Sequence, residues 1–283
     1  IPTKSEVKFQ LKDVQLYYPL MCGFPIVLKS FPTSSVFGKI VFPEDLAERM
    51  RDEGFITGVE VFNDLDEDLR MSGTHLINYP NIKINKWKKI FANSHFTAER
   101  TFEKYGVRPQ VFYPPVLNYF TPAEKKDIDF IIYSRLQKEK LPNVEEFVKS
   151  HKGKRIVAVG MDQGYAQVLK KLGVEVYADA PRNIVKWLLE RSKNYVHLMT
   201  FVDDGKVYGE HFGISIAEAV YAGARPWIPD VPSGAKEIPN TKPYKSVEEI
   251  TDDGPLSKDE IEKAVKMFDP RYRDPEEVLN LLP

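Results

Sequence analysis

The sequence predicts an α/β fold with parallel strands, divided into two domains. Helical and strand patterns alternate along most of the chain, which is typical of parallel sheets covered by helices. The length of 283 residues suits one large or two ordinary domains rather than one small core. A polar, proline-containing segment at 121–126 interrupts the pattern and indicates a boundary. We therefore expect domains at 1–122 and 123–283.

The first domain is expected to consist mainly of short strands. A helix over 43–51 has an early proline and an acidic first turn, and Ser94 is placed to cap a second helix over 96–104 that Gly106 ends. The expected strands of this domain are 14–18, 25–28, 58–62, 74–79, 89–92 and 110–113.

The second domain alternates more regularly. Ser257 and Glu260 have the spacing of a capping box, which predicts a helix to Met267, and a last short helix is expected from Asp274. The other expected helices are 144–149, a segment that ends at 172, 183–192 and a segment that begins near 214. The expected strands are 129–133, 155–159, 174–177, 195–199 and 226–228.

Composition and charge exclude several classes of protein. Hydrophobic residues make up 42% and charged residues 29%, which is typical of a soluble globular chain without a run of ~20 apolar residues that could span a bilayer. The net charge of −1 gives no general attraction to nucleic acid. Cys22 is the only cysteine, which excludes an internal disulfide or a cysteine-based zinc site and favours a reducing, cytoplasmic compartment.

One segment, GEHFGISIAEAVYAGARPWIPD at 209–230, has the pattern of an anion site. Gly213 precedes a predicted helix, and the first N–H groups of a helix, with its dipole, favour groups such as a diphosphate. Glu210 before the turn and Glu218 inside the helix can each accept hydrogen bonds from vicinal hydroxyls. The alternative interpretation is structural: an acidic helix start followed by small residues that allow close packing.

This segment and others in the same order resemble one enzyme family. The E-x7-E arrangement of Glu210 and Glu218 around Phe-Gly-Ile-Ser resembles the signature of retaining glycosyltransferases of family 4, which have the GT-B fold. The segments that resemble further motifs of the family are 93–96 (NSHF), 113–116 (YPPV), 134–140 (SRLQKEK) and 234–238 (GAKEI). The resemblance implies two Rossmann-like domains with parallel sheets facing a cleft, the first of them short.

The resemblance also implies roles for single residues. Arg135 and Lys140 would neutralise the diphosphate of a nucleotide-sugar and stabilise its charge as the glycosidic bond breaks. Glu210 would bind hydroxyls of the transferred sugar, and Glu218 those of the ribose. Lys138 is expected to be ordinary surface charge. The remaining expected donor-binding residues are Ser134, His211, Phe212, Gly213 and Ile214.

Several positions depart from the family pattern. Residues 201–208 are longer and more polar than usual, and Asp203-Asp204 before Gly205 is interpreted as a turn rather than a metal site. The first domain lacks a clear glycine-rich loop. His75 is the candidate catalytic histidine beside the reacting sugar, although a structural histidine is an equal alternative. Arg182 would lie near the nucleotide base, with a solvated arginine as the favoured alternative.

The basic segment at 83–89, from Lys83 to Lys89, is interpreted either as a peripheral contact with an anionic membrane, at its inner face, or as a solvated helix face. We expect a metal-independent and cofactor-independent hexosyltransferase that uses a UDP- or GDP-sugar and an acceptor that is a glycan, a lipid or a small molecule. The alternatives are a non-catalytic nucleotide-sugar-binding protein and a sugar phosphorylase on the same fold.

Overall fold

The computed structural model of the protein describes residues 59–60, 74–77, 89–106, 108–114 and 116–272. The chain divides into two compact units, one formed by Ile1–Leu117 with Pro270–Pro283 and the other by Asn118–Asp269. The elements expected at 14–18, 25–28 and 43–51 and the helix from Asp274 lie outside the described residues.

The described part of the first unit contains a parallel sheet with the order β1-β2-β3-β4. Its helix α3 begins after Ser94, whose side chain accepts a hydrogen bond from the Thr97 N–H, and ends at Gly106 with a φ of 68°. Both predicted caps are therefore confirmed. The bounds are β1 Val59–Glu60, β2 Thr74–Ile77, β3 Lys89–Ala92, α3 His95–Tyr105 and β4 Gln110–Val111.

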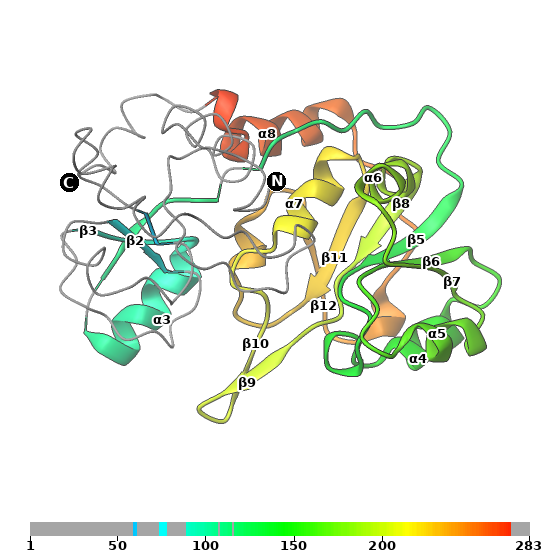
Figure 1. The fold of residues 1–283 in the computed structure, drawn as a ribbon, viewed down its shortest axis with the longest axis horizontal. Helices are drawn as coiled ribbons and strands as arrows, with labels where there is room; N and C mark the ends of the chain where they lie inside the picture. Colours follow the sequence, from blue (N-terminus) through cyan, green and yellow to red (C-terminus); the bar gives the residue numbers. More distant parts are fainter. Residues whose placement is uncertain (1–58, 61–73, 78–88, 107, 115, 273–283) are drawn as a thin grey trace, which may run out of the picture. The chain divides into compact units, whose positions relative to one another are not determined.

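The second unit is built on a six-stranded sheet in which all neighbouring strands are parallel (Figure 1). The order is β12-β11-β8-β5-β6-β7, which is the order of a doubly wound dinucleotide-binding fold. The strands are β5 Ile128–Tyr133, β6 Ile156–Gly160, β7 Glu175–Ala178, β8 Ser192–Val196, β11 Arg225–Pro229 and β12 Lys242–Tyr244. The predicted α/β class with parallel strands is confirmed.

Helices cover both faces of this sheet (Figure 1). Phe130 and Ile132 of β5 belong to one buried cluster with Phe147 of α4 and Leu169 of α5, whereas Ile131 between them points to the opposite face. The helices of the unit are α4 Val144–Ser150, α5 Ala166–Lys171, α6 Arg182–Glu190, α7 Ile214–Tyr221 and α8 Lys258–Phe268. The predicted capping box at the start of α8 is confirmed, because Ser257 and Glu260 exchange both hydrogen bonds.

Strand β8 differs from the prediction of a strand over 195–199. The strand begins at Ser192 and ends at Val196. The His197 N–H still donates to the Trp227 carbonyl of β11 at 2.9 Å, and the two residues after it lie beyond the strand. Polar residues occupy its buried start because their side chains are satisfied: Asn194 donates to the Asp129 carbonyl at 3.1 Å, and Ser192 donates to the Leu188 carbonyl at 2.7 Å. The apolar pattern therefore placed the strand too late, and it missed β12 altogether.

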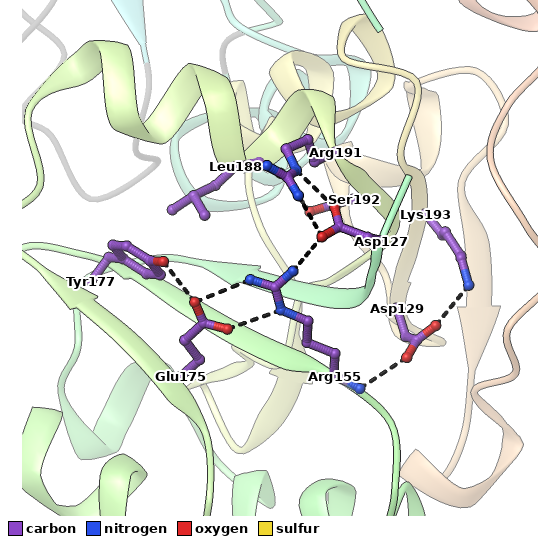
Figure 2. A network of polar contacts seen from close by, with 9 residues as sticks. All are labelled: Asp127, Asp129, Arg155, Glu175, Tyr177, Leu188, Arg191, Ser192 and Lys193. Atoms are coloured by element: carbon purple, nitrogen blue, oxygen red, sulfur yellow. Dashed lines mark hydrogen bonds and ion pairs between the residues drawn. The ribbon is translucent and has the colours of Figure 1, made fainter. Parts of the chain in front are cut away.

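A network of ion pairs joins the amino ends of several strands of the second unit (Figure 2). The Arg155 guanidinium binds both oxygens of Glu175, at 2.9 and 3.1 Å, and one oxygen of Asp127 at 2.5 Å. Arg191 binds Asp127 as well, while Lys193 pairs with Asp129 at 2.7 Å. These strand starts lie at the edge of the sheet opposite the strands' carboxyl ends, so we assign the network to stability.

Replacing Arg155 with alanine is expected to lower the free energy of unfolding by about 1 kcal/mol at neutral pH, because a bidentate pair in a network exceeds an isolated surface pair. Hydrogen bonds from Arg191 and Arg155 hold the pKa values of the Asp127 and Glu175 carboxyls below normal. The contribution of these two carboxylates to the free energy of unfolding is therefore complete above their unfolded-state pKa of about 4. It is lost as the pH falls through their lower folded-state pKa values.

Urea unfolding at neutral and acid pH tests this prediction. The difference between the wild type and Arg155→Ala should shrink at acid pH. The matched control is Lys154→Ala, because the more exposed Lys154 makes a single 3.2 Å pair with Asp252 and should change stability by less than about 0.5 kcal/mol. Equal effects of the two substitutions would contradict the importance of the network.

Candidate functional site

The order of the six-stranded sheet reverses between β5 and β8. In open parallel sheets, ligands bind at the carboxyl ends of the strands where the order reverses. The chain leaves β5 into Ser134 and Arg135, and it leaves β8 into His197. These two loops therefore mark the candidate site of the second unit.

The loop after β5 lies against the end of β6. The Ser134 N–H donates to the Val159 carbonyl at 3.1 Å, and the Leu136 N–H donates to the Met161 carbonyl at 2.8 Å. Gly160 has a φ of 154°, and a Cβ atom there would lie 1.7 Å from the Ser134 carbonyl oxygen. Only glycine allows this close approach, which sets the position of the loop that carries Arg135.

A short hairpin separates β8 from Glu210. Its strands, β9 Phe201–Asp203 and β10 Lys206–Tyr208, are antiparallel and extend away from the sheet (Figure 1). Asp204 and Gly205 form the turn with φ values of 50° and 73°, as the two-residue hairpin turn of an Asp-Gly pair requires. The turn predicted at Asp203-Asp204-Gly205 is confirmed.

The backbone of Glu210 is fixed by the segment 233–235. The Ser233 hydroxyl and the Gly234 N–H both donate to the Glu210 carbonyl at 2.9 Å. Gly209 before it donates to the Pro232 carbonyl at 3.0 Å. Segment 234–238, which resembles a motif of the family, thus has a physical role: its first residues hold Glu210 in place.

The Glu210 carboxylate lies among nitrogen-bearing side chains. The Nε2 of His197 is 3.9 Å from its Oε2, and the amide N–H of His211 donates to its Oε1 at 3.2 Å. Burial opposes ionisation of Glu210, but the positive charges near it, on the His197 imidazole when it is protonated and on the Lys140 ammonium, keep its pKa below normal. The group is therefore a partly buried carboxylate that is ready to accept hydrogen bonds.

Lys140 is a half-buried cation near Glu210. It lies in the short 3-10 helix η1, Lys138–Lys140, and its Nζ donates to the Sδ of Met199, which is a weak acceptor. Burial lowers its pKa, Glu210 raises it, and the neighbouring charge of Arg135 lowers it further. A negatively charged ligand group beside Glu210 would thus stabilise the positive charges of Lys140 and Arg135 together. Lys138 is exposed, as expected.

Helix α7 begins beside these groups. Its first residue, Ile214, follows Gly213, which has a φ of 97° and no side chain to cap the helix. The first N–H groups of a helix have no carbonyl partner within it, so the start of α7 is a natural position for an anion. A Cβ atom at Gly213 would lie 2.6 Å from Cδ1 of Ile216, and its φ is unfavourable for other residues. Helix α7 thus begins at the residue predicted.

Glu218 is bound by an arginine that sequence reasoning favoured as solvated. Arg182, the first residue of α6, forms an ion pair with Glu218 and donates to the Tyr133 hydroxyl at 2.8 Å. The guanidinium also lies 5.2 Å from the ring centre of Tyr119. The solvated interpretation of Arg182 is therefore wrong, because the buried carboxylate of Glu218 requires a partner of opposite charge. Burial raises the pKa of Glu218, and Arg182 lowers it.

Tyr195 is a fully buried tyrosine beside the start of α7. The Tyr195 hydroxyl is 3.0 Å from the Ser215 hydroxyl in the first turn of α7. Burial raises the pKa of Tyr195, and the negative charges of Glu210 and Glu218 act in the same direction. Both carboxylates therefore act on Tyr195, and the crevice that the E-x7-E spacing predicts between them stays a prediction.

Other expected residues lie elsewhere. His75 lies in β2, paired in register with Glu60 and Ile90, and its side chain is outside the described part. Residues 83–88 are outside it too. His95 begins α3 with its ring 6.1 Å from that of Tyr113. Among the described residues, no helix has the length and apolar character needed to cross a membrane, and no group of three potential metal ligands is found.

Sequence reasoning missed two residues of this site, His197 and Tyr119. His197 lies inside an apolar run, Tyr-Val-His-Leu-Met, which reads as a buried strand. Tyr119 lies in the segment that precedes the predicted boundary. The signal that could have found His197 is its place at the end of a predicted strand, where loops carry ligand-binding residues.

No established protein family matches the sequence, and no curated protein is similar to it at the sequence level. Solved structures do share the fold. AviGT4, a glycosyltransferase involved in avilamycin A biosynthesis, superposes with a TM-score of 0.62 at 14% identity, over 86% of this chain and 79% of AviGT4. A glycosyltransferase from Rickettsia africae gives a TM-score of 0.60 at 13% identity, over 83% of this chain and 78% of the other.

TarM gives a TM-score of 0.57 at 13% identity, over 74% of this chain. The match covers 50% of TarM, so this chain spans about half the length of that protein. Together with the six-stranded parallel sheet, these likenesses show that the chain has the GT-B fold of these glycosyltransferases.

Proposed function

We propose that this chain is a retaining glycosyltransferase similar to family 4, which moves a hexose from a UDP- or GDP-sugar to an acceptor without a metal ion. One observation carries the proposal. The Glu210 carboxylate, the half-buried Lys140 ammonium and the start of α7 meet at the point where the order of the parallel sheet reverses. A nucleotide-sugar offers each of these groups a complementary partner.

The diphosphate would bind at the start of α7. The N–H groups of Gly213 and Ile214 would donate to its oxygens, and Lys140 would exchange the weak Met199 contact for a phosphate oxygen. Arg135, on the loop fixed by Gly160, would add a second charge. Negative charge on the diphosphate grows as the glycosidic bond breaks, so these groups would stabilise the transition state more than the bound donor.

The two glutamates would recognise hydroxyl groups on either side of the diphosphate. Glu210 accepts hydrogen bonds and would bind the transferred hexose, with His211 and Phe212 beside it. Glu218 would bind the ribose, and its position is set by Arg182 and by the Tyr119 hydroxyl, 3.5 Å from the same carboxylate oxygen. We propose Arg182 as a positioning residue for Glu218.

The proposed reaction retains the anomeric configuration by attack on the face that the diphosphate leaves. The bond between the anomeric carbon and the diphosphate oxygen breaks, the acceptor oxygen bonds to the same carbon, and the departing phosphate oxygen takes the acceptor proton. Glu210 binds hydroxyls in this scheme and does not attack the sugar. The first domain, with His75, is proposed to bind the acceptor.

A solved neighbour suggests which ligand to test first. A mutant of TarM from S. aureus, at 14% identity and a TM-score of 0.55, was crystallised with fondaparinux, alpha-GlcNAc-glycerol and UDP. UDP is therefore the first nucleotide to try with this chain, and GDP the second.

Thermal unfolding with UDP, GDP and ADP, each free and as a sugar conjugate, tests the proposed donor site. A ligand at about a hundred times its dissociation constant adds about 2.7 kcal/mol of stability, which gives a clear rise in melting temperature. The donor that binds is then incubated with candidate acceptors, and the product anomer is assigned by NMR. Failure of every nucleotide to bind would overturn the proposal, an inverted product would overturn retention, and binding without transfer to any acceptor would favour the non-catalytic alternative.

A further inference from the structure

His197 carries a buried ring nitrogen that points at Glu210. Only 7% of its side chain is exposed, and its Nε2 has no hydrogen-bond partner among the described residues. A buried donor or acceptor without a partner costs free energy, so such a group in a candidate site indicates a ligand atom. The Nε2 of His197 is 3.9 Å from the Oε2 of Glu210.

The surroundings of His197 indicate which nitrogen carries the proton. Its Nδ1 is 3.4 Å from the hydroxyl of Tyr195, and the two rings are nearly parallel with centres 6.4 Å apart. The Tyr195 hydroxyl donates its one proton to the Tyr133 carbonyl at 3.3 Å, so the tautomer of His197 is set from the other side of the ring. The negative carboxylate of Glu210 lies on the Nε2 side and favours the tautomer that carries the proton on Nε2.

The surroundings favour the neutral imidazole. Burial lowers the pKa of His197, Glu210 raises it and Lys140 lowers it again, and the net direction is downward. A neutral ring at 3.9 Å from the carboxylate makes neither a strong ion pair nor a direct hydrogen bond, since N–H···O bonds are about 2.7–3.2 Å long. One oxygen atom can nevertheless lie within bonding distance of both groups.

The chemistry of the two groups selects that oxygen. His197 can donate to it, whereas the Glu210 carboxylate can only accept from it. A phosphate oxygen would be repelled by Glu210, and a carbonyl oxygen could not donate. A hydroxyl accepts one hydrogen bond and donates another, so it satisfies both groups at once.

We propose that His197 is a specificity-determining residue that donates from Nε2 to one hydroxyl of the transferred hexose, while the same hydroxyl donates to Glu210. This inference rests on the proposed function and deepens it, because it assigns a second protein partner to a single sugar hydroxyl. His197 then favours donors that carry this hydroxyl. Lys140 remains the proposed partner of the diphosphate.

The test pairs two variants with a set of altered donors. His197→Phe keeps a planar ring beside Tyr195 but has no donor, and His197→Gln retains an N–H in a similar place. The probes are UDP-glucose or GDP-mannose, whichever binds the wild type more tightly, and its monodeoxy analogues, one for each hexose hydroxyl. Melting temperatures confirm that both variants are folded. Calorimetry with the free nucleotide measures the affinity of the nucleotide-binding part of the site, without the hexose.

His197→Phe is expected to lower kcat/KM about tenfold with the complete donor, which corresponds to one hydrogen bond in a desolvated site. His197→Gln should recover part of this loss, and the affinity for free nucleotide should stay unchanged in both variants. With one deoxy analogue, and only that one, His197→Phe and the wild type should react at similar rates.

An equal loss with every deoxy analogue, or no loss at all, would overturn the role of His197. Loss of affinity for the free nucleotide would also overturn it, because a sugar contact should not affect that measurement. The proposed function fails separately, namely if the wild type binds no nucleotide. NMR of the ligand-bound protein should show a neutral imidazole with its proton on Nε2. A proton on Nδ1 alone would overturn the proposed hydrogen bond from Nε2 to the sugar hydroxyl.

Discussion

Replacing Glu210 with glutamine is expected to reduce the rate of glycosyl transfer at least about a hundredfold. The variant keeps the size of the side chain. It replaces one accepting carboxylate oxygen by an amide NH2 group, which donates and cannot accept hydrogen bonds from the sugar hydroxyls. It also removes the negative charge that partners Lys140 and lies 3.9 Å from His197. Loss of one group that stabilises a buried transition state costs about 10²–10³ in rate.

The measurement separates sugar recognition from nucleotide binding. Transfer is followed by release of free nucleotide, and the affinity for UDP or GDP alone is measured by calorimetry. The affinity should change little in Glu210→Gln, since Lys140 and the start of α7 are the proposed diphosphate partners. Glu237→Gln is the control: this acid ends the 3-10 helix η2, Gly234–Glu237, in the segment that supports Glu210, and it should lower transfer less than twofold. Undiminished transfer by Glu210→Gln would remove its proposed role.

Local signals explain which parts of the fold the sequence predicted well. The start of α7 was placed correctly because a glycine precedes it, and Gly213 adopts the left-handed φ of 97° that glycine allows. The start of α8 was placed correctly because a capping box is complete within four consecutive residues, Ser257 to Glu260. Both features are determined by neighbours in the chain, and no knowledge of the sheet is needed to see them.

Contacts between distant segments explain what the sequence left undetermined. The pair of Arg182 and Glu218 joins the start of α6 to the middle of α7, and Tyr119 joins it from the segment that precedes the sheet. Neither periodicity nor capping rules contain this information. The same holds for His197. Its proposed role depends on the carboxylate of Glu210, which is separated from it in the chain by the hairpin of β9 and β10.

Polar side chains inside a sheet produced the one misplaced strand near the site. Ser192 and Asn194 are fully buried in β8 and satisfied by hydrogen bonds, whereas the apolar residues that look like the strand follow it. Binary patterning assigns buried polar residues to loops, and it fails where tertiary partners satisfy them. The correct end of β8 places His197 at the carboxyl end of the strand, where ligands bind, rather than in the strand's interior.

Replacing Gly160 with alanine is expected to lower the free energy of unfolding by at least about 3 kcal/mol, or to prevent folding. The added Cβ would lie 1.7 Å from the Ser134 carbonyl oxygen and 2.7 Å from its carbonyl carbon. These are backbone atoms at the carboxyl end of β5, so the clash cannot be relieved by a side-chain rotation. The φ of 154° adds strain for any residue with a side chain.

Gly164→Ala is the matched control, because it separates strain from collision. Gly164 also has a positive φ, of 90°, but a Cβ atom there meets nothing within 4 Å. Its substitution should therefore cost only the strain of a left-handed alanine, about 1–2 kcal/mol. Urea unfolding measures both, and a folded Gly160→Ala should also bind UDP or GDP more weakly, since its collision displaces the loop of Ser134 and Arg135. If the two variants are equally stable, the close approach of β6 to this loop does not exist, and Arg135 loses the support that places it at the diphosphate.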